Sequence, residues 1–456
     1  MNRSEKNNNR PHPELPSVSS VVSDKAKTAG LVLSALLLCV GFLVGLCWFI
    51  RPHKSETEKR ELTEFPTFTI ESFLSGKFTD QVSLWYADTY PGREGLIQAY
   101  HGVQSLFGIR GEQYNQGDVG DAVPDGTMPS APSAPDEPAE PDRPVSGGED
   151  GEKVGGYYLS GDTAYELYAY SEKNAQTYAA LMNKAATLTV GRAKVYDLII
   201  PLHYSFALSA DVQDSMDLPD ASKTIRYMYS GMNADVHTVD AYSALMAHAD
   251  EYIYFRTDHH WTATGAYYAY EAYCKQAGIE PTPLASYEKM AFGGFLGTLY
   301  SKTEQPSAMS GNPDTVEAYV PKGTNDEYIY DANGGDRTRY RGGVVRKDTD
   351  AFYANPASKY NCFLMGDHPL IEIHNEQVSE AGKGRTVLLV KESFGNAFAP
   401  FLVDSYEYVY VVDYRYYAGT LSELVDAKGI DDVIFLNNVV AATGGARLAE
   451  MEKFVK

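Results

Sequence analysis

The segment FRTDHHWTATGAYYAY, residues Phe255–Tyr270, gathers an acid, two histidines and a tryptophan where the flanking sequence predicts a strand-to-helix turn. Before the acid, Glu251–Phe255 alternates in the manner of a strand rich in aromatic and β-branched residues. After the tryptophan, Thr262 or Thr264 can cap a helix that ends near Gly278. Turns of this kind in α/β sheets project their side chains into a cleft. The stretch therefore predicts an α/β fold and the place of its site.

Within this turn, Asp258 and His260 form an Asp-x-His pair. In an extended segment, residues two apart point to the same side, so Asp258 and His260 are expected together while His259 points elsewhere. A carboxylate beside an imidazole fixes the tautomer and stabilises the protonated ring, as a general base requires. An isolated Asp–His pair more often ties down a loop, so the rest of the chain must decide between the two interpretations.

The remainder of the chain alternates strand-like and helix-like segments, which predicts a doubly wound α/β domain. A helix is expected at Glu166–Ala186, and Lys289–Pro356 is expected to form loops and short strands. Continuous apolar runs are typical of strands buried on both faces of a parallel sheet. The predicted strands are Lys194–Pro201, Arg385–Lys391, Tyr406–Asp413 and Asp431–Asn437.

Polar residues follow the last three of these strands, where ligands bind in open α/β sheets. Ser393 is expected on a sharp turn, with the N–H groups of the next helix free to hold a developing oxyanion. Arg415 follows the second strand, and Asn437 and Asn438 end the third. Simpler roles for these residues are a helix cap for Ser393, an ion pair with Asp413 for Arg415, and turn formation for the asparagines.

Chain length, net charge and composition limit the classes of function that the protein can have. The 456 residues carry a net charge of −22, which argues against nucleic acid as a partner because nothing would neutralise its phosphates. The 35 tyrosines suit ring-shaped polar ligands such as sugars, but tyrosine also fills half-buried strands. Cys274 and Cys362 are the only cysteines outside an apolar N-terminal segment, and a disulfide between them is left open.

The N-terminal third predicts a membrane-anchored protein. Residues 1–28 are expected to form a cytoplasmic tail, and Ala29–Ile50 is 22 residues without a charge, long enough to be a transmembrane signal anchor. An extracytoplasmic segment is expected at 51–112. Residues 113–156 carry ten acids against two bases in a Pro-, Ala-, Ser- and Gly-rich sequence, which predicts a disordered linker or insertion. The catalytic domain is expected at 157–456.

The sequence TDHHWT at Thr257–Thr262, with KESFGNAFAPFL and VVDYRYYAG downstream, resembles the DHHW family of bacterial envelope proteins. That family is in turn similar to the alginate O-acetylation proteins of the SGNH-hydrolase superfamily. The resemblance covers most of the chain after the apolar segment. It implies a three-layer α/β/α fold with a parallel sheet, in which the circularly permuted motif order runs acid, base, serine.

Carried over by position, the resemblance places the triad acid at Asp258, the base at His260 and the nucleophile at Ser393. His259 departs from the pattern of the alginate proteins, so either histidine remains a candidate base. The implied oxyanion donors are the backbone N–H of Ser393, Gly395 or its neighbour Asn396, and Asn438 or Asn437.

Two further residues near these motifs have candidate roles in substrate binding. Trp261 can stack on a sugar ring or simply pack against the core. Arg415 can contact an anionic sugar or phosphate.

The expected function is a membrane-anchored, extracytoplasmic serine O-acyltransferase or esterase that acts on envelope carbohydrate without a cofactor or metal. The resemblance implies a multi-spanning membrane acyltransferase as partner. One alternative is a metal-dependent phosphoesterase with Asp258, His259 and Asp348 or Asp350 as ligands. Another is a catalytically inactive scaffold protein of an envelope assembly. The glycan, the acyl group and the choice between transfer and hydrolysis are left open.

Overall fold

The computed structural model describes residues 121–128, 144, 147–303, 306–340, 343–346 and 356–456, with scattered positions between 45 and 92. The chain divides into two units, Met1–Tyr100 and His101–Lys456. In the first unit, β1 (Lys54–Ser55) pairs antiparallel with β2 (Arg60–Glu61). The second unit contains every residue of the predicted site.

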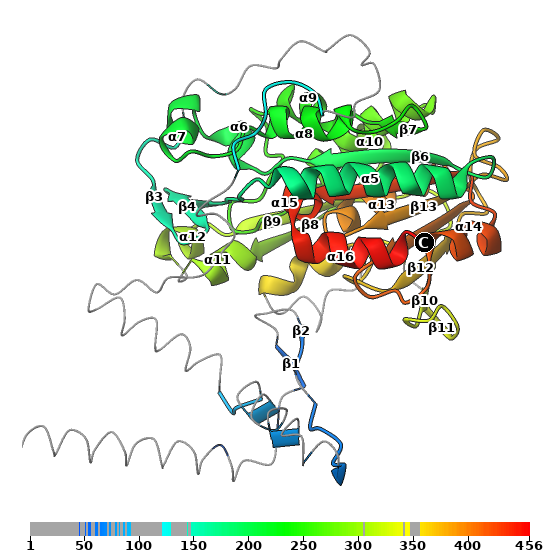
Figure 1. The fold of residues 1–456 in the computed structure, drawn as a ribbon, viewed down its shortest axis with the longest axis horizontal. Helices are drawn as coiled ribbons and strands as arrows, with labels where there is room; N and C mark the ends of the chain where they lie inside the picture. Colours follow the sequence, from blue (N-terminus) through cyan, green and yellow to red (C-terminus); the bar gives the residue numbers. More distant parts are fainter. Residues whose placement is uncertain are drawn as a thin grey trace, which may run out of the picture. The chain divides into compact units, whose positions relative to one another are not determined.

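The second unit is built on an eight-stranded sheet in the order β11-β10-β12-β14-β13-β15-β6-β7 (Figure 1). The strands from β14 to β7 are parallel neighbours, whereas β12, β10 and β11 extend the sheet as antiparallel neighbours. In that spatial order the bounds are β11 (Arg337–Tyr340), β10 (Glu327–Tyr330), β12 (Leu370–His374), β14 (Tyr408–Asp413), β13 (Thr386–Lys391), β15 (Asp432–Asn438), β6 (Lys194–Ile200) and β7 (Val236–Thr238).

Helices cover both faces of this sheet, because its central strands are apolar on both sides. In Figure 1, α5 and α16 lie in front of the sheet and α13 behind it. The front group is α5 (Glu172–Thr189), α8 (Ala221–Ser230), α14 (Leu421–Lys428), α15 (Val439–Thr443) and α16 (Gly445–Phe454). The other group is α9 (Ala241–Met246), α10 (Ala263–Ala277) and α13 (Gly395–Leu402).

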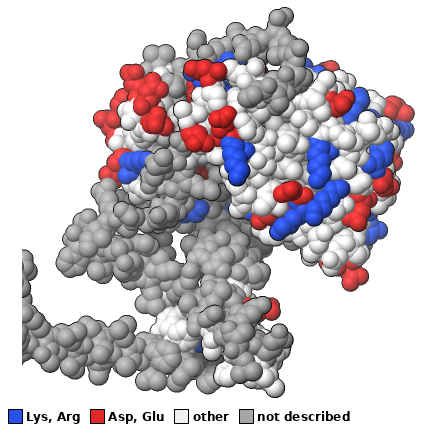
Figure 2. All heavy atoms as spheres, viewed as in Figure 1, with Lys and Arg blue, Asp and Glu red and all other residues white. Residues whose placement is uncertain are grey.

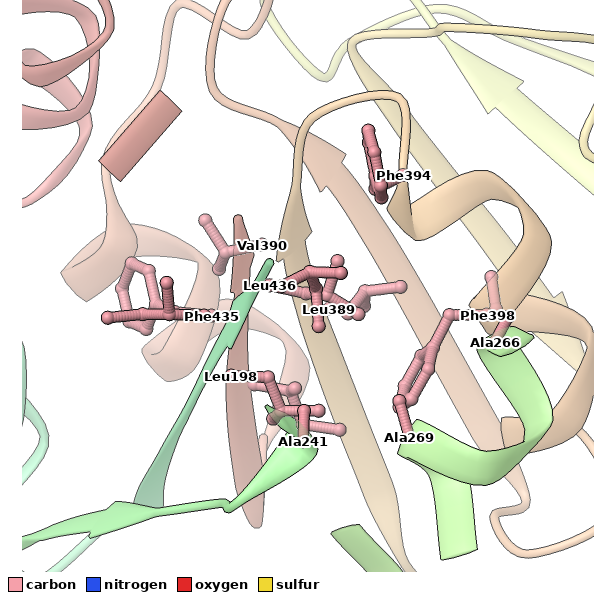
Figure 3. Close-up of a cluster of buried hydrophobic side chains, with 14 of the residues drawn as sticks. Leu198, Ala241, Ala266, Ala269, Leu389, Val390, Phe394, Phe398, Phe435 and Leu436 are labelled. Atoms are coloured by element: carbon pink, nitrogen blue, oxygen red, sulfur yellow. The ribbon is translucent and has the colours of Figure 1, made fainter. Parts of the chain in front are cut away.

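Packing between the sheet and the second group of helices holds α13 in place. Figure 3 shows Phe398 of α13 beside Ala266 and Ala269 of α10, next to Leu389 of β13. The small side chains of these alanines let α10 approach α13 closely, and both alanines are fully buried. Core packing along α13 therefore helps to fix the helix that follows the predicted nucleophile.

Smaller elements surround the sheet. The helices α6 (Tyr204–Ala207) and α7 (Ala210–Ser215) follow β6, and 3₁₀ turns occur at Leu284–Ser286 and Pro356–Cys362. A three-stranded antiparallel sheet contains β3 (Glu152–Val154), β4 (Tyr157–Ser160) and β5 (Thr163–Glu166). The antiparallel pair β8 (Glu288–Phe295) and β9 (Asp314–Val320) is joined through α11 (Thr298–Lys302) and α12 (Ser307–Gly311).

Acidic side chains gather around α7 on the face drawn in Figure 2, among them the exposed Asp211, Asp214 and Asp217. Basic side chains on the same face lie further toward the other end, with acids between them. A face with this distribution repels polyanions near α7.

The predicted α/β class with a parallel sheet is confirmed, as are the strands that became β6, β13, β14 and β15. The helix expected from Glu166 begins instead at Glu172, because Glu166 ends β5. The helix after the DHHW segment is confirmed as α10: Thr262, rather than Thr264, caps it by accepting from the Gly265 N–H, and Gly278 ends it with φ +68°.

The strand predicted at Glu251–Phe255 is wrong. This segment makes only an isolated bridge between Tyr254 and Trp261, and it folds back on itself through Thr262 N–H to Ile253 O, 2.8 Å. Tyr254 and Phe255 are nonetheless buried in the core. The aromatic alternation therefore reflects burial of an irregular segment, not membership of a sheet.

The expected domain division stays a prediction. The predicted anchor Ala29–Ile50 lies outside the described residues except for Gly45. In the part of the chain that the structure describes, no helix is both long and apolar enough to cross a bilayer. Described parts of the predicted linker contact the second unit: the Met128 N–H donates to Ser230 Oγ at 2.9 Å, and Glu152–Val154 forms β3.

Cys274 and Cys362 are free, buried thiols, so the disulfide left open by the sequence is not formed. Burial raises the pKa of Cys274 to about 12, because the thiolate is poorly solvated there. Both cysteines are structural residues of the core.

We predict that Asp197, in the middle of β6, makes stability pH-dependent. It is fully buried, its Oδ1 accepts from Tyr178 Oη at 2.6 Å, and its Oδ2 has no partner among the described residues. Burial raises the pKa of Asp197 to about 7, although the bond from Tyr178 opposes the shift. Because an aspartate in the unfolded chain titrates near ~3.9, the native state binds the extra proton between these values and loses stability as pH rises.

The variant Asp197→Asn keeps the acceptor for Tyr178 and removes this titration. Its free energy of unfolding, measured by urea denaturation from pH 4.5 to 8, is expected to fall less with pH than that of the wild type, by on the order of 3 kcal/mol over the range. Asp235→Asn, at an exposed position, is the control. Parallel curves for wild type and Asp197→Asn would contradict this account.

Candidate active site

Ser393 lies on a tight turn between β13 and α13, in the middle of the parallel part of the sheet. The turn is closed by Gly395 N–H to Glu392 O at 2.9 Å and Asn396 N–H to Ser393 O at 3.2 Å. The residue that caps α13 is Phe394, so the simpler role of Ser393 as a helix cap is wrong. The serine side chain is half-buried and its hydroxyl faces a histidine.

Asp258, His260 and Ser393 form one line of hydrogen bonds. His260 Nδ1 lies 2.5 Å from Asp258 Oδ1, and His260 Nε2 lies 2.7 Å from Ser393 Oγ. The His260 backbone N–H also donates to Asp258 Oδ1, at 3.0 Å. His260 and Asp258 are both buried. The structure thus brings together the three residues that the sequence proposed as a triad. Ser393 follows the end of β13 as expected, whereas Asp258 and His260 come from a bend rather than from a strand end.

Thr298, at the start of α11, holds the other oxygen of the Asp258 carboxylate. Its backbone N–H and its hydroxyl donate to Asp258 Oδ2 at 2.8 and 3.1 Å. Burial would raise the pKa of Asp258, but the two adjacent imidazoles and these hydrogen bonds hold it well below its usual range. A Cβ atom at Gly297 would collide with the Asp258 side chain, so this approach requires glycine. No sequence signal pointed to Thr298, because it lies in Lys289–Pro356, where only loops and short strands were expected.

His259 does not contact Ser393. Its Nδ1 lies 2.6 Å from Thr298 Oγ1 and 3.9 Å from Asp258 Oδ1, and its ring is tilted against that of His260 with centroids 3.9 Å apart. Burial, with the neighbouring His260, lowers the pKa of His259 to about 3, so the ring is neutral. Between the two histidines left open by the sequence, His260 alone has the geometry of a base for Ser393.

Aromatic side chains fix the base and the nucleophile. Tyr360 stacks on His260 with ring centroids 4.1 Å apart and planes 12° apart, and its hydroxyl donates to Ser393 O at 3.1 Å. Trp261 is fully buried and its Nε1–H donates to Phe394 O at 3.0 Å. Trp261 therefore packs against the nucleophile turn, and its expected alternative role of stacking on a sugar is wrong.

Most of the expected oxyanion donors are already engaged. The Gly395 and Asn396 N–H groups close the turn, and the Asn437 amide bonds to Tyr178 and Tyr414. Asn438 Oδ1 caps α15 by accepting from the Ala441 N–H. Among the described residues, the Ser393 N–H and the Asn438 side-chain NH₂ remain without a protein partner.

A buried charge network lies behind the serine. Lys391 Nζ contacts Asp367 Oδ1 at 2.8 Å and Asp413 Oδ2 at 3.0 Å, with Lys391 and Asp413 fully buried. Arg415 forms a bidentate pair with Asp413 and also contacts Asp367, at 2.8 Å. Nε and Nη2 of its guanidinium make these contacts, so Arg415 has the structural role of an ion pair. Asn396 Nδ2 joins the network through Asp367.

Glu392, directly before the serine, is a buried acid that sequence analysis did not single out. Its Oε1 accepts from the Asn438 N–H at 3.0 Å, and its Oε2 accepts from the Phe394 N–H at 3.2 Å and lies 3.3 Å from Ser393 Oγ. Burial raises the pKa of Glu392, although Arg415 opposes the shift. The carboxyl group ties the ends of β13 and β15 together next to the serine.

Asp258, His259 and His260 are close enough for one atom of each to face a common metal ion. The 2.5 Å separation of Asp258 Oδ1 and His260 Nδ1 is nevertheless that of a hydrogen bond. Two ligand atoms that each bind zinc at about 2.0–2.2 Å lie further apart than this. Both ring nitrogens of His260 are engaged, and Asp348 and Asp350 lie outside the described residues. The geometry therefore favours the triad over the metal site.

We predict that the network behind Ser393 stabilises the fold. Lys391→Met leaves Asp367 and Asp413 with Arg415 as the one cation of the network, and loss of one partner from a buried ion pair costs about 3–5 kcal/mol. The free energy of unfolding, measured by guanidinium denaturation, is expected to fall by that amount. The control Lys289→Met removes an exposed pair with Glu317 and should cost less than about 1 kcal/mol. Equal losses in the two variants would contradict the prediction.

Comparison with known proteins identifies the family of the chain. The family model described as DHHW protein matches residues 58–133 and 134–412. Curated proteins give no match to the chain. A crystal structure of a DHHW family protein from Eubacterium siraeum DSM 15702 is 27% identical with a TM-score of 0.59, over 68% of this chain and 98% of that one.

Two more distant structures are also similar. Bacillus cereus PatB1, solved with a sulfonyl adduct, is 19% identical with a TM-score of 0.51, over 66% of this chain and 97% of its own, and shares the fold. The O-acetyltransferase domain of Pseudomonas putida AlgJ is 15% identical over 68% of this chain and 99% of its own. Its TM-score of 0.33 is too low to support an argument.

Proposed function

The chain belongs to the DHHW protein family, and within that family we propose that it is a serine O-acyltransferase or esterase with Ser393 as nucleophile, His260 as base and Asp258 as acid. The observation that carries the proposal is the line of hydrogen bonds from Asp258 through His260 to Ser393 Oγ, at 2.5 and 2.7 Å. The order of these residues along the chain is that of a circularly permuted SGNH-like site.

In the first step, His260 Nε2 takes the proton of Ser393 Oγ while Oγ attacks the carbonyl carbon of the acyl donor. The ionised Asp258 carboxylate stabilises the imidazolium that forms. The bond from the carbonyl carbon to the leaving group then breaks, and His260 returns its proton to the leaving group. In the second step, an acceptor hydroxyl or water gives its proton to His260 and attacks the same carbon, which releases Ser393 Oγ.

Oxyanion stabilisation is assigned to the Ser393 N–H and the Asn438 side-chain NH₂. Both lack a protein partner among the described residues, and both lie at the ends of the neighbouring strands β13 and β15. The start of α13 follows directly and adds the positive end of its dipole. Removing one such donor typically costs about 10²–10³-fold in kcat.

The substrate class proposed is carbohydrate of the bacterial envelope, which rests on the family resemblance. The uncharged segment Ala29–Ile50 supports a location at the membrane, with the site on the extracytoplasmic side. In that arrangement a multi-spanning acyltransferase would supply the acyl group. We propose no cofactor and no metal.

The test is acylation of Ser393. The full chain is incubated with p-nitrophenyl acetate and, separately, with phenylmethylsulfonyl fluoride, and intact-mass analysis with peptide mapping locates the adduct. Ser393→Ala and His260→Ala are expected to lower turnover by at least about 10³-fold, because members of a triad act as a unit. His259→Ala is expected to keep the adduct on Ser393.

Each outcome discriminates between assignments. An adduct that is lost in His259→Ala but kept in His260→Ala would identify His259, rather than His260, as the base. A folded wild type that forms no adduct with either reagent would refute the enzyme assignment and leave a scaffold role. Circular dichroism of each variant separates loss of chemistry from loss of fold.

A further inference from the structure

The mechanism above leaves His259 without a role. It is nevertheless held as firmly as the base: its Nδ1 lies 2.6 Å from Thr298 Oγ1, and its ring packs on His260 at 3.9 Å between centroids. Its side chain keeps 21% of its surface exposed, against 7% for His260. His259 is therefore the more accessible of the two imidazoles.

The bonds around Asp258 determine which nitrogen of His259 carries the proton. The Thr298 hydroxyl has a single proton, and Asp258 Oδ2 beside it at 3.1 Å is an ionised carboxylate that can only accept. With that proton directed to the carboxylate, Thr298 Oγ1 must accept from His259, so Nδ1 is the donor. The reverse orientation would point an oxygen lone pair at the anion. These bonds place a proton on Nδ1, and because burial and the neighbouring His260 lower the pKa of His259, the ring carries no second proton on Nε2.

Its Nε2 is consequently a free hydrogen-bond acceptor. No described residue bonds to this atom, and it is not a buried, unsatisfied group. Both histidines direct Nδ1 toward Asp258 and Thr298. Within an imidazole ring Nε2 points away from Nδ1, so the Nε2 atom of each histidine faces away from the Asp258 and Thr298 side. For His260 that direction leads to Ser393 Oγ, and the His259 ring packs against the His260 ring.

We propose that His259 Nε2 accepts a hydrogen bond from a second hydroxyl of the acyl acceptor, next to the one that attacks, so that the site selects a 1,2-diol such as a sugar ring. This inference rests on the proposed function and specifies its acceptor. The attacking hydroxyl has one proton, which must go to His260, so it cannot also donate to His259. A neighbouring hydroxyl can.

His259 neither gains nor loses a proton in the deacylation step. The attacking oxygen forms its bond to the acyl carbon and passes its proton to His260 Nε2. The tetrahedral intermediate collapses, the bond from carbon to Ser393 Oγ breaks, and His260 returns the proton to Oγ. His259 holds the second hydroxyl throughout and is a positioning residue that touches the acceptor. Water, which has two protons, can satisfy both histidines during hydrolysis.

The test separates acylation from transfer. The full chain is acetylated with p-nitrophenyl acetate in a single turnover, and acetyl transfer to trans-1,2-cyclohexanediol and to cyclohexanol is compared by mass spectrometry. The wild type is expected to favour the diol per hydroxyl. In His259→Leu, acylation of Ser393 stays within about 3-fold, whereas the diol preference and the rate of hydrolysis fall about 3- to 10-fold, the worth of one hydrogen bond.

Two variants give the matched comparison. His259→Gln places an amide oxygen near the position of Nε2 and is expected to recover part of the diol preference. His248→Leu, whose ring contacts Glu251 and Tyr268 instead of the triad, is expected to change nothing. A wild type without diol preference, or a His259→Leu enzyme that keeps it, overturns the proposal. A wild type that cannot acetylate Ser393 refutes the proposed function itself.

The tautomer provides a readout independent of activity. In ¹⁵N NMR of histidine-labelled protein, the resonances lost in His259→Gln are expected to be those of a neutral ring protonated at Nδ1. Protonation at Nε2 would remove the free acceptor and overturn the inference, whatever the kinetics show.

Discussion

An ionised carboxylate in the protein interior is the constraint on which the site depends. Burying a charge is costly unless it is fully hydrogen-bonded, and Asp258 accepts bonds from the His260 ring and backbone and from the Thr298 hydroxyl and backbone. Each of those bonds also fixes its donor. The same anion thereby orients the base, fixes the tautomer of His259 and joins the DHHW bend to the start of α11.

A second buried acid holds the residues that lead into the Asp258–His260 bend. Asp314 of β9 accepts from the Thr257 N–H at 2.8 Å and forms an ion pair with Arg256 at 3.0 Å. From the other side, Trp261 bonds to Phe394, and Tyr360 covers His260 and bonds to Ser393. The base and the nucleophile come from segments 133 residues apart, and these contacts hold them at hydrogen-bonding distance without any shared secondary structure.

The sequence predicted those strands and helix ends that depend on burial or on local backbone geometry. The runs that became β6, β13, β14 and β15 are apolar because they are covered on both faces, and Thr262 and Gly278 mark the ends of α10. The sequence correctly predicted the pairing of Asp258 with His260, but it did so from a strand predicted at Glu251–Phe255, which the structure does not contain. Thr298 and Tyr360 could not be predicted as site residues, because distant segments bring them to the triad. Lys391 and Glu392 directly precede Ser393 in the chain, but their partners Asp367, Asp413 and Asn438 come from distant segments. For Trp261 and Arg415 the sequence left a ligand role and a structural role open, and the structure shows packing for Trp261 and ion pairing for Arg415.

The position of β15 has a consequence for how the chain folds. This strand lies between β13 and β6, yet it follows both of them in the sequence. Until it is inserted, the two halves of the sheet each expose an apolar parallel edge, and such edges invite association with other chains. Closure through contacts between distant segments is slow, so a newly made chain passes through a vulnerable stage. Protection by a chaperone matters most for this protein in the interval before β15 docks.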